Sequence, residues 1–241
     1  MNSTGRAIDR LDSRSFERRL AAGALVILPV GALEAHGPHL PLGADEIQAR
    51  STAEALAPEL DAVIAPSIPF GACLASHPFP GTASLTVGTL DTLVHELLSE
   101  FVRMGARRIL VLSGHAERGH MAALRDAASR TMSEHPAARI MVVSDYEFVY
   151  ELRGDLAPTT DGHGGLLETS RVLALAPESV GPERPVVTPH YSPFVPAVPT
   201  VAEWPESVQG DTRPATAELG AKVQAHVLKR LREVVREQLP A

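Results

Sequence analysis

The sequence predicts an α/β fold in which helices cover both faces of a mainly parallel sheet. Short apolar runs of strand length alternate along the chain with longer segments of helical periodicity. The chain has 241 residues, of which 44% are hydrophobic, and this is enough for one sizeable core. Because no linker interrupts the pattern, we expect residues 1–241 to form a single domain.

Four apolar runs are the predicted strands. They are Ala24–Val30, Ala62–Ala65, Arg108–Leu112 and Arg139–Ser144. Continuous hydrophobic runs of this length are typical of parallel strands that are buried on both faces. In open α/β sheets ligands bind outside the carboxyl ends of the strands, so the side chains that follow these runs are the first candidates for function.

Five segments with helical patterns lie between and after these runs. In one of them, Thr89–Met104, apolar residues recur at the spacing of a helix face, at Leu90, Leu93, Val94, Leu97, Leu98 and Phe101. The other four are Asp45–Leu60, Glu117–Glu134, Leu166–Leu175 and Thr216–Gln238.

The segment 177–214 differs from the rest because proline recurs through it, at Pro182, Pro185, Pro189, Pro193, Pro196, Pro199 and Pro205. Proline fixes φ and lacks a backbone N–H donor. This spacing therefore predicts an ordered excursion or a lid without regular structure.

The composition of the chain limits its expected partners and its expected location. The net charge is −7 and no dense basic stretch is present, so neither nucleic acid nor a membrane surface is an expected partner. The longest apolar stretch, Ala21–Leu33, is broken by glycine and proline and is too short to span a bilayer. Met1–Arg19 lacks the apolar core of a secretory signal, and the single cysteine, Cys73, excludes an intrachain disulfide. We expect a cytoplasmic protein.

A cluster of potential metal ligands follows the first predicted strand. Glu34 and His36 are two residues apart, and side chains at that spacing share one face of a strand. Glycines and prolines then turn the chain, so that Asp45 can return a carboxylate to the same place. Converging oxygen and nitrogen donors are what a divalent metal needs.

A second cluster repeats this spacing after the third predicted strand, at His115 and Glu117. With the first cluster it supplies two imidazoles and three carboxylates, an inventory that suits two metal ions roughly 3.5–4 Å apart with one bridging carboxylate. One ion would polarise a carbonyl while a metal-bound water, its pKa lowered towards about 7, attacks it.

A third cluster lies in the glycine-rich segment 161–170. His163 is a candidate proton shuttle to a leaving nitrogen, because an imidazole titrates near neutral pH. Asp161 is a candidate base. Glu168 is an additional ligand, an acceptor that orients a metal-bound histidine, or only a carboxylate favoured by a helix N-terminus.

A fourth, turn-rich segment spans residues 71–82, where Ser76, His77 and Thr82 are candidates for the substrate pocket. Cys73 lies in the same segment, but a nucleophile elbow requires a helix directly after the turn, and the prolines that follow exclude one. His39 and His120 are expected to be structural or to support the ligands from behind.

Together these clusters resemble the creatininase (creatinine amidohydrolase) family. The matching segments occur in the family's order from about residue 20 to 225: LPVGALEAHGPHLPLGAD, HPFPGT, SGHAERGH, DGHGGLLETS and the later Gly210-Asp211, Ala215-Thr216 and Gly220. The resemblance implies an α/β/α sandwich with two divalent metal ions, zinc paired with zinc, manganese or iron. It also implies hydrolysis of a cyclic or other non-peptide amide, and a homo-oligomer such as a hexamer.

Carried over by motif, the resemblance assigns one metal to Glu34, Asp45 and His115. It assigns the other to His36, Asp45 and Glu117, with Asp45 bridging, and it gives His163 the role of proton relay.

The chain departs from creatinine-cleaving relatives around the expected substrate. Those enzymes have an aromatic residue where Ala116 stands, an acidic residue where Gly162 stands, and tryptophans near the relay histidine, whereas the only tryptophan here is Trp204. These departures argue against creatinine itself. Ala116 and Trp204 join the predicted pocket residues, with Tyr146 and Tyr150 as expected walls.

The expected function is therefore a metal-dependent amidohydrolase that opens a lactam-like ring or cleaves a small linear amide. Two alternatives keep the fold and change the substrate: a formamide hydrolase of flavin or deazaflavin biosynthesis, and a peptidase that trims a redox-cofactor precursor peptide. A third is a non-catalytic metal-binding relative. The complete set of carboxylates argues against this last reading.

Overall fold

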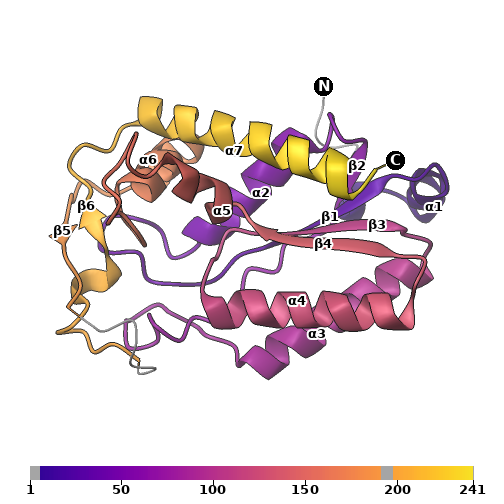
Figure 1. The fold of residues 1–241 in the computed structure, drawn as a ribbon, viewed down its shortest axis with the longest axis horizontal. Coiled ribbons are helices and arrows are strands. Elements are labelled where there is room, and N and C mark those ends of the chain that lie inside the picture. Colours follow the sequence, from indigo (N-terminus) through magenta and orange to yellow (C-terminus); the bar gives the residue numbers. More distant parts are fainter. Residues whose placement is uncertain (1–5, 191–197, 241) are drawn as a thin grey trace.

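A four-stranded parallel sheet forms the centre of the protein. The computed structural model describes residues 6–190 and 198–240. In it the strands stand in the order β2-β1-β3-β4, and each neighbouring pair is parallel (Figure 1). Their bounds are β1 Leu25–Val30, β2 Ala62–Ile64, β3 Arg108–Ser113 and β4 Arg139–Ser144. The mainly parallel sheet predicted from the sequence is confirmed.

Helices cover both faces of this sheet, which gives the expected three layers (Figure 1). One face carries α3 (Val87–Arg103) and α4 (Arg118–Glu134). The other carries α2 (Ala44–Leu56), α5 (Tyr146–Val149), α6 (Leu166–Leu175) and α7 (Ala217–Gln238). The short α1 (Ser13–Ala21) precedes β1, and neither it nor α5 was predicted.

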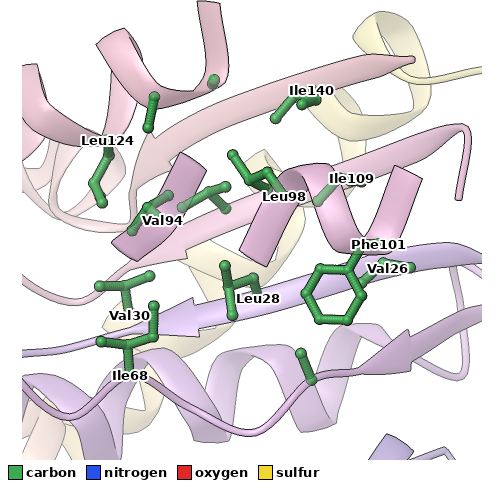
Figure 2. Close-up of a cluster of buried hydrophobic side chains, with 14 of the residues drawn as sticks. Val26, Leu28, Val30, Ile68, Val94, Leu98, Phe101, Ile109, Leu124 and Ile140 are labelled. Atoms are coloured by element: carbon green, nitrogen blue, oxygen red, sulfur yellow. The ribbon is translucent and has the colours of Figure 1, made fainter. Parts of the chain in front are cut away.

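The alternation of side chains along β1 divides the core into two parts. Val26, Leu28 and Val30 point to the α3–α4 side, where they meet Val94 and Leu98 (Figure 2). The intervening Leu25 and Ile27 belong to the cluster on the opposite side. Full burial of such a side chain contributes about 1.5–3 kcal/mol, so both helix layers are held mainly by apolar contact with the sheet.

Side-chain caps start three of the helices. Thr86 Oγ1 accepts a hydrogen bond from the amide of Thr89 at 3.1 Å, which lets α3 begin two residues before the predicted start. Thr216 caps α7 in the same way, and Asp12 caps α1.

The proline-rich segment has more regular structure than expected. A single 3₁₀ turn occupies Pro177–Ser179, and β5 (Val186–Val187) pairs antiparallel with β6 (Gly210–Asp211). At Pro205–Ser207 the chain makes a turn in which Glu206 and Ser207 have positive φ. The prediction of no regular structure is therefore wrong at the 3₁₀ turn and at the β5–β6 pair, because proline is compatible with a first helical position and with short edge strands. Its residues 191–197 lie outside the described part of the chain.

The strand order places a topological switch point between β1 and β3. The chain leaves β1 towards β2 on one side, and β3 then pairs with the other side of β1. A crevice outside the carboxyl ends of two such strands is the usual ligand site of an open α/β sheet. No helix of the described residues is both long and apolar enough to cross a membrane.

Candidate metal centre

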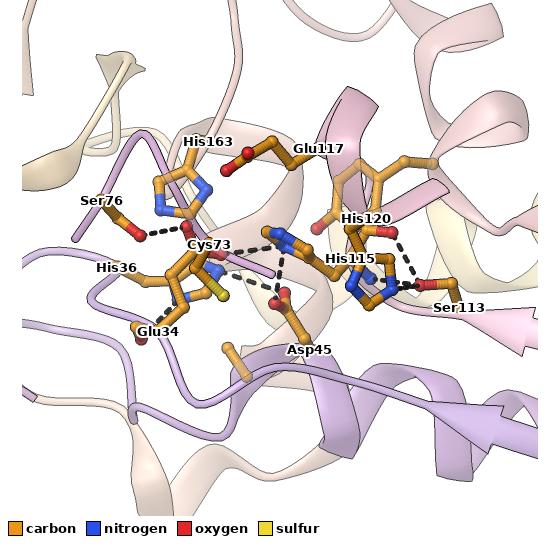
Figure 3. A network of polar contacts seen from close by, with 12 residues as sticks. Glu34, His36, Asp45, Cys73, Ser76, Ser113, His115, Glu117, His120 and His163 are labelled. Carbon is orange, nitrogen blue, oxygen red and sulfur yellow. Dashed lines mark hydrogen bonds and ion pairs between the residues drawn. The ribbon is translucent and has the colours of Figure 1, made fainter. Parts of the chain in front are cut away.

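Five of the predicted polar side chains meet at this switch point. Figure 3 shows four of them: Glu34, His36, Asp45 and His115. Glu34 and His36 follow β1, and His115 follows β3. Asp45 lies in the first turn of α2, and Glu168 in the first turn of α6. All five side chains are buried.

The expected reason for the Glu34–His36 convergence is wrong, because β1 ends at Val30 and both residues lie in the following loop. A close approach of two backbones brings Asp45 beside the end of β3. A Cβ at Gly114 would overlap the carbonyl oxygen of Asp45, so only glycine lets the end of β3 contact the start of α2.

Backbone carbonyls fix which ring nitrogen of each histidine faces the cluster. Nδ1 of His36 lies 3.0 Å from the carbonyl oxygen of Glu34, and Nε2 of His115 lies 3.1 Å from that of Ala72. A carbonyl only accepts, so each of these nitrogens carries the proton. Nε2 of His36 and Nδ1 of His115 then face the carboxylates. When the ring is neutral these are its lone-pair nitrogens, and that is the state that binds a metal.

Asp45 lies between the two histidines. Its Oδ1 is 3.2 Å from Nε2 of His36, and its Oδ2 is 3.1 Å from Nδ1 of His115. Each carboxylate oxygen thus faces a different lone-pair nitrogen. This is the arrangement of a carboxylate that bridges two cations.

The other two carboxylates each belong to one histidine. Glu34 Oε2 lies 2.9 Å from Nδ1 of His115, while its Oε1 accepts a hydrogen bond from Ser76 Oγ at 2.5 Å. Glu168 Oε1 lies 3.5 Å from Nε2 of His36 and accepts a hydrogen bond from Gln48 at 3.0 Å. Two donor groups follow from these contacts: Glu34, Asp45 and His115, and His36, Asp45 and Glu168.

The electrostatics of the cluster favour bound cations. Glu34 Oε2, His36 Nε2 and Asp45 Oδ2 are buried and have no hydrogen-bond partner, an expensive arrangement without a positive charge between them. Burial lowers the pKa of His36, but Asp45 and Glu168 outweigh it and raise that pKa well above its usual value. Burial also lowers the pKa of His115, but Glu34 and Asp45 outweigh it, so this pKa too is raised well above its usual value. The donor set therefore fits divalent metal ions.

Behind the cluster lies a buried polar network that sequence reasoning missed. Gln48 Oε1 accepts hydrogen bonds from Tyr146 and Arg171, which leaves its amide nitrogen to donate to Glu168. Arg171 in turn pairs with Asp145 at 2.7 Å. The available signal was spacing: Gln48 stands three residues after Asp45, and Arg171 three after Glu168, on the same helix faces.

His163 lies beside the cluster, whereas Asp161 does not. The His163 ring stacks on His36 at 4.1 Å, and its Nε2 donates to the carbonyl of Ala35 at 2.8 Å, which leaves Nδ1 available for a proton. Both oxygens of Asp161 accept backbone hydrogen bonds, from Leu166 and Leu167. Its side chain holds the start of α6, and the structure gives no support to the expectation of a base.

A cavity of about 170 Å³ opens onto the cluster. The expected wall residues Ala116, Tyr146, Tyr150 and Trp204 line it, together with Glu117 and His163. Glu117 is half-buried, and its Oε2 accepts a hydrogen bond from the amide of Ala75 at 3.2 Å. The structure does not place it in either donor group, and the second group contains Glu168 instead.

The segment 71–82 supports the cluster more than it lines the cavity. Ser76 is buried against Glu34, and Thr82 Oγ1 accepts a hydrogen bond from the amide of Ala35 at 3.0 Å. His77 is exposed. The structure therefore does not bring these three predicted pocket residues to the cavity wall.

His39 and His120 have the supporting contacts that were expected. His39 Nε2 lies 2.8 Å from Thr169 Oγ1. His120 Nδ1 accepts from the amide of Ala72, and its other nitrogen meets Ser113. Burial lowers the pKa of His120 to about 2, with a further contribution from His115, so its ring stays neutral.

Comparison with known proteins gives a consistent result. The sequence model of the family described as creatininase, creatinine amidohydrolase, matches residues 9–235. The chain is 29% identical over 257 residues to the creatinine amidohydrolase of Pseudomonas putida, covering 97% of each protein. It is 30% identical over 219 residues to the mycofactocin precursor peptide peptidase of Mycolicibacterium smegmatis, covering 85% of this chain and 81% of that protein.

Solved structures of creatininase share the fold over nearly the whole chain. A manganese form matches with a TM-score of 0.89 at 25% identity, covering 98% of this chain and 99% of the other. A mutant of Zn-Zn type matches with the same TM-score and identity over 100% of both chains. A mutant complexed with creatine matches with a TM-score of 0.87 at 25% identity, covering 98% and 99%.

Proposed function

The chain belongs to the creatininase family of amidohydrolases, and from this premise and the geometry at Asp45 we propose that it hydrolyses a small amide at a centre of two divalent metal ions. The observation that supports the proposal is the position of Asp45, whose two oxygens face Nε2 of His36 and Nδ1 of His115. The manganese and zinc in the matching creatininase structures support metals of this kind.

We assign the first ion to Glu34, Asp45 and His115, and the second to His36, Asp45 and Glu168. Zinc with zinc, manganese or iron suits these nitrogen and oxygen donors. When bound, such ions polarise a carbonyl and lower the pKa of water towards about 7. The chain's own part is to hold the donors in place through the carbonyls of Glu34 and Ala72 and through Gln48.

Two further side chains of the cavity are proposed to move or hold protons. His163 has Nε2 committed to the Ala35 carbonyl, so Nδ1 is the atom that exchanges a proton with the leaving nitrogen. Glu117 faces the same cavity from the start of α4, and we propose that its carboxylate holds water or takes a proton there. Asp161 is left out of this machinery because both its oxygens cap α6.

The size of the cavity favours a compact substrate. About 170 Å³, walled by Trp204, Tyr146 and Tyr150, suits a lactam-like ring or a small linear amide. A second candidate is cleavage of a peptide bond, because a mycofactocin precursor peptide peptidase covers most of the chain at 30% identity. Both candidate functions use the same metal ligands and differ only in the size of the substrate that must fit in the cavity.

Metal removal tests the proposal directly. The purified protein is expected to contain two divalent ions per chain, and a chelator is expected to abolish amide hydrolysis. Each ion present at about a thousand times its Kd contributes about 4 kcal/mol, so the Tm of the metal-free protein should be lower by at least about 10 °C. Metal analysis, thermal unfolding and a panel of cyclic amides, formamides and short peptides provide the measurements.

The control is re-addition of zinc or manganese to the chelated protein. Recovery of both Tm and turnover would show that the chain itself was undamaged. A protein that binds no divalent ion and keeps the same Tm in chelator would contradict the metal centre. Two bound ions with no turnover on any amide would instead favour a non-catalytic metal-binding protein.

The roles of Glu168 and Glu117 are separated by one pair of variants. Because Glu168 lies against His36, Glu168→Gln is expected to lower bound metal from two ions to one and turnover by about a hundredfold. Glu117→Gln should lower kcat by a similar factor while metal content stays near two, since neither donor group contains it. If Glu117→Gln loses an ion and Glu168→Gln keeps both, then Glu117 is the ligand, as expected from the sequence, and the assignment of Glu168 is refuted.

A further inference from the structure

The single cysteine of the chain lies against the first donor group. The sulfur of Cys73, the carboxylate of Glu34 and a ring nitrogen of His115 all lie within 4.8 Å of one another (Figure 3). Cys73 is fully buried, and Glu34 Oε2 beside it is a buried carboxylate oxygen without a hydrogen-bond partner. The thiol therefore lies beside a buried carboxylate oxygen that is available to a cation.

The backbone around Cys73 is held from both sides by residues of the centre. The amide of Ala72 donates to His120 Nδ1, and the Ala72 carbonyl accepts from His115 Nε2. The amide of Cys73 itself donates to Ser84 Oγ at 2.8 Å. These bonds fix the sulfur relative to His115 before any ion binds, which is the preorganisation that a ligand position requires.

We propose that Cys73 is a sulfur ligand of the ion held by Glu34 and His115. This assignment rests on the metal centre proposed above and makes its two positions chemically different. A thiolate selects zinc over manganese, whereas the position of His36, Asp45 and Glu168 has one nitrogen and otherwise oxygen donors, which manganese accepts. The sulfur thus determines which ion occupies which half of the centre.

Cobalt(II) titration of the metal-free protein tests the assignment without using activity. Visible d–d absorption reports that cobalt has bound, and a near-ultraviolet charge-transfer band reports a thiolate bound to it. Because the chain has one cysteine, such a band has no other source in this protein. The expected result is both signals in the unmodified protein, and only the visible one in Cys73→Ser and Cys73→Ala.

A selectivity measurement supplies the second readout. Cys73→Ser is expected to weaken zinc binding by about tenfold or more while manganese binding changes little. A side chain that merely fills space would lower both affinities together, with the fold checked by circular dichroism.

The outcomes separate the two proposals. Visible cobalt absorption without the near-ultraviolet band in the unmodified protein overturns the ligand role of Cys73 and leaves the metal centre intact. No cobalt absorption of either kind overturns both.

Discussion

Asp45→Asn is expected to reduce bound metal from two ions to at most one and to lower turnover by on the order of 10³-fold or more. The two oxygens of Asp45 lie 3.2 Å and 3.1 Å from lone-pair nitrogens of His36 and His115. An asparagine offers one oxygen and one NH₂ group, so it can serve one side only, and it removes a negative charge from both. Metal content per chain and kcat/KM at saturating zinc provide the measurements.

The matched control is Glu46→Gln, which makes the same change of charge at the next position of α2. Glu46 lies outside both donor groups, so its metal content and turnover should equal those of the unmodified protein. Two ions retained in Asp45→Asn would show that Asp45 does not bridge. An equal loss in Glu46→Gln would point to the general charge of the helix start instead.

The sheet was predictable because its strands are buried on both faces. The predicted runs agree with β1, β2, β3 and β4 to within one residue at each end, since an apolar run that must fill a parallel sheet has few alternatives. Helix ends were less predictable. The chain leaves α2 at Leu56 rather than Leu60, where only local contacts decide.

The centre was predictable in its residue types and less so in its partners. Converging carboxylates and imidazoles are a sequence signal, and the structure brings Glu34, His36, Asp45 and His115 together. What fixes their geometry is not in the pattern: the carbonyl of Ala72 orients His115, and the close approach at Gly114 brings Asp45 near. Such backbone contacts join segments far apart in the sequence, so spacing alone does not reveal them.

The same reasoning explains why Glu168 was undecided and Arg171 was overlooked. A carboxylate in the first turn of a helix is favourable without any ligand, so the sequence allowed Glu168 several roles. An arginine in a helix usually faces solvent, whereas Arg171 is fully buried and pairs with Asp145. A buried charge of this kind is identified only by its partners.

Arg171→Met is expected to lower the free energy of unfolding by about 3–5 kcal/mol, because it leaves Asp145 charged and unpaired in the core. For a chain of this size that corresponds to a Tm lower by roughly 6–20 °C. Gln48 also loses its Arg171 contact, so its hold on Glu168 loosens and the second ion should bind about tenfold more weakly. Denaturant unfolding and metal titration check the two effects.

Two variants and one pH comparison identify the cause of that loss. Arg125 pairs with Glu147 on the surface beside α5, with both side chains about half exposed, so Arg125→Met should cost no more than about 1 kcal/mol. Combining Arg171→Met with Asp145→Asn removes the stranded charge and should recover part of the stability.

Burial already raises the pKa of Asp145, although Arg171 opposes the shift, and without Arg171 the pKa must rise further. A folded-state pKa above the unfolded one means that stability is lost as pH rises through it, so Arg171→Met should be less destabilising near pH ~5 than near pH ~8. An equal loss at both pH values, with no recovery in the double variant, would attribute the effect to packing rather than to the charge of Asp145.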